Sequence, residues 1–127
     1  MSRIAVFIDG AYLEFLLRQE FGAPKIDFEL LVRQIAGTHE LLRTYYYDCL
    51  PLAVDLVQLA AKRQVTDAAL LAGDSDFLPA IEAAKSDGIV VHLFHGRAPH
   101  DELRICCDER TRIDRALIDS VRLVASQ

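Results

Sequence analysis

Two aspartates, Asp74 and Asp76, stand two residues apart directly after an apolar run and a glycine. The run, residues 68–72, is short and rich in alanine and leucine, which favours a buried strand over a helix. Gly73 permits a tight turn after it. Ligands of open α/β sheets bind at the carboxyl ends of the strands, so both carboxylates are expected at a binding crevice. Because no cation stands beside them in the sequence, a divalent ion such as Mg²⁺, which prefers oxygen ligands, would offset their repulsion.

Two further acids extend this pattern. Asp9 follows another apolar run, residues 3–8, and precedes Gly10. Asp55 is a lone acid on an otherwise apolar helix, and it faces solvent or points into a polar site because an unpaired buried charge is costly. If the strands at 3–8 and 67–72 are neighbours, Asp9, Asp74 and Asp76 converge on one crevice, and Asp55, on the helix that leads into the second strand, could close the cluster from the side. A metal ion held there would activate a water and stabilise charge on a phosphodiester oxygen, which is the chemistry of phosphoryl transfer.

Each aspartate also has a purely structural interpretation. An aspartate at a helix start acts as a cap and interacts favourably with the helix dipole, and Asp-Gly is a strong turn signal by itself. For Asp55, a solvated helix face is as good an interpretation as a site. Asp74 and Asp76 form a pair, and Asp9 stands at a second strand end; together they favour a metal or phosphate site.

Other polar residues give weaker indications. Ser75 lies between the two aspartates, but no histidine or lysine is placed to activate it, so a role in the turn is favoured over nucleophilic attack. Arg97 follows a later strand at the same expected edge of the sheet, where it could touch a phosphate. His39 and His92 are interpreted as a surface residue and a strand residue.

The segments that must position these residues alternate between strand and helix patterns. Strands are predicted at residues 3–8, 41–47, 67–72 and 89–94, with a short edge strand at 110–113. Helices are predicted at residues 11–20, 28–36, 52–62, 78–86 and 101–108, with a last one from Asp114 to about residue 124. The alternation favours an α/β fold with a central, mostly parallel sheet and helices on both faces.

Composition sets further bounds. The 127 residues suffice for one domain with a sizeable core, and we expect a single domain over residues 1–127. No run approaches the roughly 20 apolar residues that span a bilayer, and no signal peptide is evident. The three cysteines, two of them adjacent, suit reduced thiols in the cytoplasm rather than a disulfide framework. With a net charge of −5, attraction to a nucleic acid must come from local basic patches or bound cations.

Three stretches carry a family resemblance: Ile8-Asp9-Gly10, Leu52-Ala-Val-Asp-Leu56 and Gly73-Asp74-Ser75-Asp76-Phe77. Together they resemble the NYN domain family, relatives of the PIN-domain nucleases and of LabA-like proteins, and the resemblance covers nearly the whole chain. It implies a PIN-like three-layer sandwich and a ribonuclease that depends on Mg²⁺ or Mn²⁺, with RNA as its substrate. The catalytic and metal-binding roles would belong to Asp9, Asp55, Asp74 and Asp76, and Ser75 would orient the loop or a phosphate.

The chain departs from the family pattern at two points. The family often has Asn where this chain has Tyr12, and a tyrosine would stack on a base or simply pack. The family also usually carries an insert with a basic residue at a point where Pro51 and Leu52 are here adjacent. Both departures favour an alternative, a catalytically degenerate NYN domain that binds RNA or protein as a regulatory module.

Two expectations about rival chemistry and partners complete the interpretation. A phosphatase acting on small phosphate esters is a further alternative, although such enzymes carry a second acid two residues after the first, and Asp9 is followed by Gly10 and Ala11. The acidic balance leads us to expect a homodimer or a protein partner that supplies basic surface.

Overall fold

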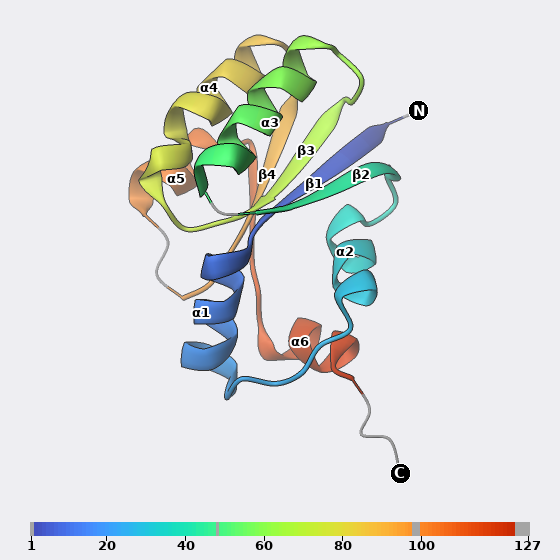
Figure 1. The fold of residues 1–127 in the computed structure, drawn as a ribbon, viewed down its shortest axis with the longest axis vertical. Coiled ribbons are helices and arrows are strands. Elements are labelled where there is room, and N and C mark those ends of the chain that lie inside the picture. The colour runs from blue at the N-terminus through green and yellow to red at the C-terminus, as the bar shows by residue number, and fades with distance from the viewer. Residues whose placement is uncertain (1, 48, 98–99, 124–127) are drawn as a thin grey trace.

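A parallel sheet runs through the centre of the molecule (Figure 1). The structure is a computed structural model that describes residues 2–47, 49–97 and 100–123. In this part of the chain the sheet has five strands in the order β2-β1-β3-β4-β5, and every neighbouring pair is parallel. The strands are β1 (Arg3–Asp9), β2 (Glu40–Tyr47), β3 (Asp67–Leu71), β4 (Val90–His95) and β5 (Glu109–Arg112).

Helices cover both faces of this sheet (Figure 1). They are α1 (Gly10–Phe21), α2 (Phe28–Ala36), α3 (Cys49–Ala61), α4 (Leu78–Ser86), α5 (Asp101–Cys106) and α6 (Arg115–Val121), with a 3₁₀ turn, η1 (Ser75–Phe77), before α4. Successive side chains of a strand point to opposite faces, so Phe7 packs in the layer of α3, α4 and α5 whereas Ile8 packs in the layer of α1, α2 and α6. The predicted three-layer α/β architecture is confirmed.

The helix boundaries follow from local capping chemistry. α2 has the predicted bounds because the Asp27 side chain accepts a hydrogen bond from Leu30 N at 3.2 Å, and Gly37 follows with φ 61°. α5 ends at Cys106, short of the predicted residue 108, because Asp108 leaves the helix and its carboxylate accepts a hydrogen bond from Val91 N at 2.8 Å.

The C-terminal elements agree with their sequence patterns in kind and order. The predicted edge strand is β5, which pairs with β4 and lies at the edge of the sheet. The last helix is capped by Asp114, as predicted, and ends at Val121, after which Arg122 is extended. Residue 124, the predicted end, lies outside the described residues.

Because all five strands are parallel, the sheet has two chemically distinct ends. We call the end where the strands finish the carboxyl edge, and the end where they begin the amino edge. β1 and β3 are neighbours, with Ile8 opposite Leu71, so the segments that follow these two strands leave the carboxyl edge side by side. Across the described residues no helix combines the length and apolar character needed to cross a membrane.

Candidate functional site

Asp9 is the last residue of β1 and is buried at the carboxyl edge. Its side chain accepts a hydrogen bond from Tyr12 N at 3.3 Å and so caps α1. The strand that carries it lies beside β3, as convergence of the aspartates required. The structural interpretation of Asp9, a residue at a strand-to-helix turn, is therefore correct, and the residue lies at the carboxyl edge beside the end of β3.

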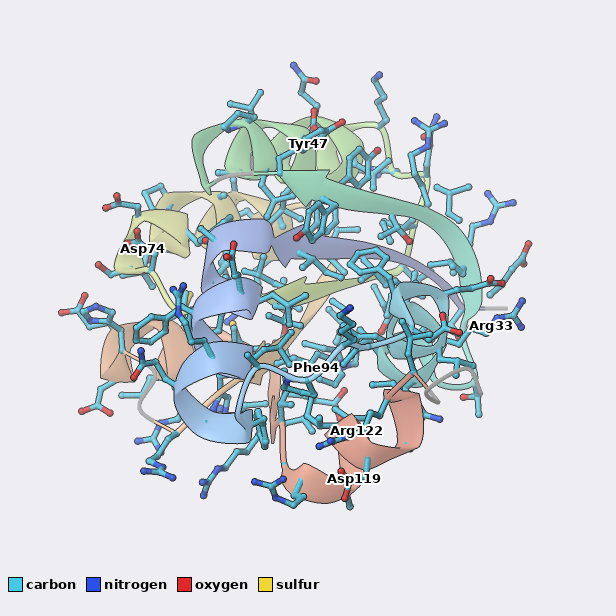
Figure 2. All side chains as sticks on the ribbon, turned by 60° about the horizontal axis from the view of Figure 1, so that its bottom comes forward. Arg33, Tyr47, Asp74, Phe94, Asp119 and Arg122 are labelled. Atoms are coloured by element: carbon cyan, nitrogen blue, oxygen red, sulfur yellow. The ribbon has the colours of Figure 1, made fainter. Side chains whose placement is uncertain are left out.

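Asp74 and Asp76 lie in the turn that follows β3, and both are exposed. The Asp74 side chain accepts a hydrogen bond from Asp76 N at 2.9 Å, which caps η1. Ser75 begins η1 and is half-buried. In Figure 2 the Asp74 side chain lies at the left of the molecule and Tyr47, at the end of β2, lies at the top.

Asp55 lies in the middle of α3, the helix that follows β2, and it does not line the pocket that Asp76 borders. Leu52 and Leu56 on this helix are buried in the core, whereas Asp55 is half-exposed. Asp76 faces the same helix, because it borders a shallow pocket of about 410 Å³ between α3 and the start of α4 that Val57 also lines. Among the described residues, no lysine or arginine forms an ion pair with Asp55, Asp74 or Asp76.

The spacing of these carboxylates limits how they could hold an ion. Within the described part of the chain, no three of the four predicted aspartates, Asp9, Asp55, Asp74 and Asp76, bring their oxygens within 4.8 Å of one another. Carboxylate oxygens nevertheless fit a hard cation such as Mg²⁺, which is commonly held by one or two carboxylates together with waters and substrate phosphates. The donor chemistry at the carboxyl edge fits an ion of this kind.

Tyr12 packs across the ends of β3 and β4. Its hydroxyl accepts a hydrogen bond from Gly96 N at 2.8 Å. Its ring lies so close to Gly73 that a side-chain carbon there would overlap it. Burial raises the pKa of the Tyr12 phenol above its usual 10.0. Of the two roles considered for this residue, the structure shows packing.

Arg97, the remaining predicted substrate contact, follows β4 at the carboxyl edge. Its backbone N–H donates a hydrogen bond to Glu20 Oε2 at 2.9 Å, which ties the loop after β4 to α1. Its side chain is exposed, so it is available to a ligand at this edge.

A pocket of about 450 Å³ opens beside Asp9, between α1, β2 and the start of α3. Glu14, Tyr46 and Tyr47 line it, and the two tyrosine rings are about half exposed. Glu14 is a further acid beside this pocket, and the sequence patterns did not single it out. Glu14 follows Gly10 by four residues, so the two lie on the same face of the helix, and this spacing is the sequence signal that indicates its position beside the end of β1.

One compact group of metal-binding residue types lies at the other end of the strands, the amino edge. Its members are His39, Asp67 and His92, whose possible ligand atoms all lie within 4.8 Å of one another. Among the described residues, this is the group of three or more histidine, cysteine, aspartate or glutamate residues that lies close enough to hold a metal ion. Burial alone would raise the pKa of Asp67, but hydrogen bonds from Thr66 and His92 hold that pKa below its usual 3.8. The sequence reasoning did not connect these residues. An aspartate that begins a fully buried strand was the signal available.

Solved structures share the fold. A protein of unknown function from Vibrio parahaemolyticus matches with a TM-score of 0.77 at 15% identity, over 96% of each chain. A pilus assembly-related protein from Burkholderia pseudomallei matches with a TM-score of 0.53 at 21% identity, over 94% of this chain and 85% of that one. At these identities the likeness shows the fold alone. No curated protein matches the sequence significantly.

The family is shown by the sequence itself. The model of the NYN domain matches residues 49–114, just over half of the chain. The matched segment contains Asp55, Asp74 and Asp76, and Asp9 lies before it. This match confirms the resemblance and connects the chain to a family related to PIN-like ribonucleases. The chain belongs to the NYN domain family.

Proposed function

We propose that this protein is a ribonuclease that depends on Mg²⁺ or Mn²⁺ and hydrolyses RNA phosphodiester bonds at the carboxyl edge of its sheet. The observation that carries the proposal is the position of Asp9, which ends β1, and of Asp74, which follows the adjacent parallel strand β3 at the same edge. The carboxyl ends of parallel strands are where open α/β sheets bind their ligands. Membership of a ribonuclease-related family supports the same conclusion.

The proposed roles follow from how each carboxylate is held. Asp9 and Asp74 would be the principal metal ligands, and each is oriented by a backbone N–H at a helix start. Asp76 and Asp55 would add negative charge from the side of α3. When bound, the ion would supply an activated water and stabilise charge on the phosphodiester. The bound cation would also offset the electrostatic repulsion between an acidic protein and a polyanionic substrate.

The pocket beside Asp9 suits single-stranded RNA. Unstacked bases are commonly recognised by stacking on aromatic side chains. Tyr46 and Tyr47 offer half-exposed rings there, and the Tyr46 ring makes an edge-on contact with Phe28, with ring centroids 5.0 Å apart. Arg97, on the other side of α1, would contact a phosphate.

The second candidate is a catalytically degenerate NYN domain that binds RNA or protein, and the packing of Tyr12 favours it. The family's asparagine would orient a carboxylate or a water with its amide. Tyr12 instead lies against Gly73, and its hydroxyl is occupied by Gly96 N. In this chain, Tyr12 therefore makes a packing contact at the position where the family's asparagine would direct a polar group at the metal site.

A cleavage assay separates the candidates. A labelled single-stranded RNA oligomer is incubated with Mn²⁺ and the wild type, Asp74→Asn or the control Asp119→Asn, an exposed aspartate on α6 far from Asp74 in Figure 2. Asparagine keeps the oxygen that caps η1, so Asp74→Asn preserves the fold. We expect its cleavage rate to fall at least about 10- to 100-fold, the loss typical even of residues that only support a metal ligand, while Asp119→Asn retains activity.

The other possible results of this assay distinguish the alternative functions. Cleavage that persists with EDTA, or that is equal in Asp74→Asn and the wild type, contradicts the proposal. RNA binding without cleavage by the wild type establishes the degenerate module. Hydrolysis of a small phosphomonoester without cleavage of RNA indicates a phosphatase.

A further inference from the structure

We propose that His39, Asp67 and His92 form a second metal site, at the amino edge of the sheet, that binds Zn²⁺ or a similar late transition-metal ion. This site lies at the opposite end of the strands from the four aspartates and does not depend on the ribonuclease proposal. It would join the loop before β2 to the central strands β3 and β4.

Sheet geometry places two of the ligands side by side. Asp67 begins β3 opposite Val90, and His92 lies in the neighbouring strand β4 opposite Ala69. Alternate residues of a strand share a face, and Ala69 and Phe94 both pack in the layer of α1, α2 and α6. Asp67 and His92 therefore project toward that same layer. Asp67 Oδ2 lies 2.7 Å from His92 Nε2.

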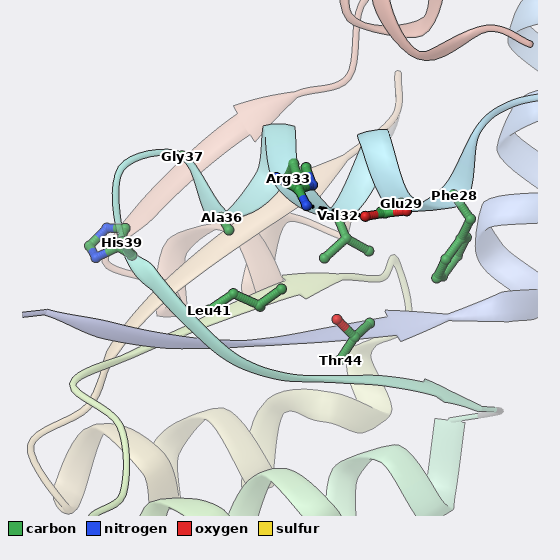
Figure 3. Close-up of a pocket in the computed structure, with 9 residues that line it drawn as sticks. All are labelled: Phe28, Glu29, Val32, Arg33, Ala36, Gly37, His39, Leu41 and Thr44. Carbon is green, nitrogen blue, oxygen red and sulfur yellow. Dashed lines mark hydrogen bonds and ion pairs between the residues drawn. The ribbon is translucent and has the colours of Figure 1, made fainter.

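His39 supplies the third ligand from the loop between α2 and β2. The chain turns at Gly37, whose φ of 61° is in the left-handed region, and His39 stands just before the first residue of β2 (Figure 3). His39 Nδ1 lies 3.9 Å from Asp67 Oδ1 and 2.8 Å from Ser2 Oγ. The His39 and His92 ring centroids are 5.6 Å apart. The loop thus presents an imidazole directly to a buried carboxylate.

The distances suit a tetrahedral ion with small adjustments. Zn–N and Zn–O bonds of about 2.0–2.1 Å place tetrahedral donor atoms roughly 3.3 Å apart. The distance of 2.7 Å joins His92 Nε2 to Asp67 Oδ2, whereas the distance of 3.9 Å joins His39 Nδ1 to Asp67 Oδ1. A single carboxylate oxygen would therefore bind the ion after a small rotation of the Asp67 side chain, with the donor atoms adjusting by about 0.6 Å toward the tetrahedral spacing. Three protein ligands and a water complete the usual four-coordinate shell.

Supporting residues orient the ligands as in established metal sites. His92 Nδ1 lies 2.7 Å from Glu109 Oε2, which gives the carboxylate–histidine–metal arrangement that fixes a ring and its tautomer. Thr66 Oγ1 donates a hydrogen bond to Asp67 Oδ1 at 2.5 Å. With both imidazoles neutral, the carboxylates of Asp67 and Glu109 balance the charge of a divalent ion.

The donor set also selects the class of ion. Imidazole nitrogens favour Zn²⁺ and its neighbours, whereas Mg²⁺ prefers oxygen ligands alone. The side chains of His39, Asp67 and His92 are only 25%, 10% and 16% exposed, so the ion would be largely shielded from water.

The test uses the full chain, stripped with EDTA and titrated with Zn²⁺ by calorimetry. We expect one tightly bound Zn²⁺ ion per chain, and a melting temperature about 10 °C higher at a hundredfold excess of Zn²⁺ over its dissociation constant. Glu109→Gln should weaken binding about 10- to 100-fold. Glu109 is 65% exposed, so this variant leaves the fold intact. Glu102→Gln, exposed on α5, is its matched control.

Further variants separate this site from the carboxyl edge. His39→Gln should lose the tight Zn²⁺ site, whereas Asp74→Asn should keep it whether or not the protein cleaves RNA. The proposal is overturned if Zn²⁺ does not bind saturably, if Mg²⁺ displaces Zn²⁺ from the site that His39→Gln removes at comparable concentrations, or if wild type, His39→Gln and Glu109→Gln bind Zn²⁺ equally.

Discussion

The contact between Gly73 and Tyr12 gives a quantitative prediction about the carboxyl edge. A methyl group added at Gly73 would overlap the Tyr12 ring, and the ring is held in place by the bond of 2.8 Å between its hydroxyl and Gly96 N. Gly73 is not among the described glycines with positive φ, so the cost of Gly73→Ala is steric. Overpacking of this kind costs about 1–3 kcal/mol, and a strained or lost hydrogen bond adds about 1 kcal/mol. We therefore expect Gly73→Ala to lower the free energy of unfolding by roughly 2–4 kcal/mol.

Urea unfolding followed by circular dichroism measures this loss, and Tyr12→Ala provides the reference background. With the ring removed, Gly73→Ala should become neutral or stabilise the protein by about 0.4–1 kcal/mol, because alanine restricts the unfolded chain. The double-mutant cycle then yields a coupling free energy of about 2 kcal/mol or more, which is large for one pair of residues in contact. An equal loss in both backgrounds would refute the packing of Tyr12 over Gly73.

Two further predictions test other parts of the structure. A Cβ at Gly10 would lie 2.9 Å from Tyr46 Cζ, but that ring is about half exposed and can move away. Gly10→Ala should therefore lower the free energy of unfolding by less than about 1 kcal/mol in the same urea assay, clearly less than Gly73→Ala does. A larger loss would show that the Tyr46 ring is fixed. Burial raises the pKa of the Cys107 thiol from 9.0 to about 12, so above pH 9.0 the unfolded chain ionises while the folded thiol stays protonated, and stability falls. Relative to Cys107→Ala, the wild type should lose about 2 kcal/mol of unfolding free energy between about pH 8 and about pH 10.5, and parallel pH profiles for the two proteins would contradict this.

Local sequence was sufficient to place most helices and strands because their boundaries depend on nearby residues. Asp27 and Gly37 bracket α2 through an N-cap and a left-handed turn, and both can be recognised without knowing the rest of the fold. The aspartates at the carboxyl edge were predictable for a related reason. In a parallel sheet every strand end points the same way, so Asp9 and Asp74 share an edge once both strands are identified.

The amino-edge group could not be predicted because it depends on contacts between distant segments. Asp67 and His92 are 25 residues apart and meet only because β3 pairs with β4 in one particular register. His39 joins them from a loop whose path depends on how α2 packs on the sheet. The contact between Tyr12 and Gly96 spans 84 residues and was hidden for the same reason. Strand order and loop packing, rather than local propensity, determine these arrangements.

A crystal structure of the wild-type protein grown with Mn²⁺ tests the central claim most directly. We expect anomalous density at the carboxyl edge in contact with Asp9 and Asp74, and its loss in crystals of Asp74→Asn. Density confined to His39, Asp67 and His92, or absent from the carboxyl edge in both proteins, would contradict the assignment of the catalytic metal to these aspartates.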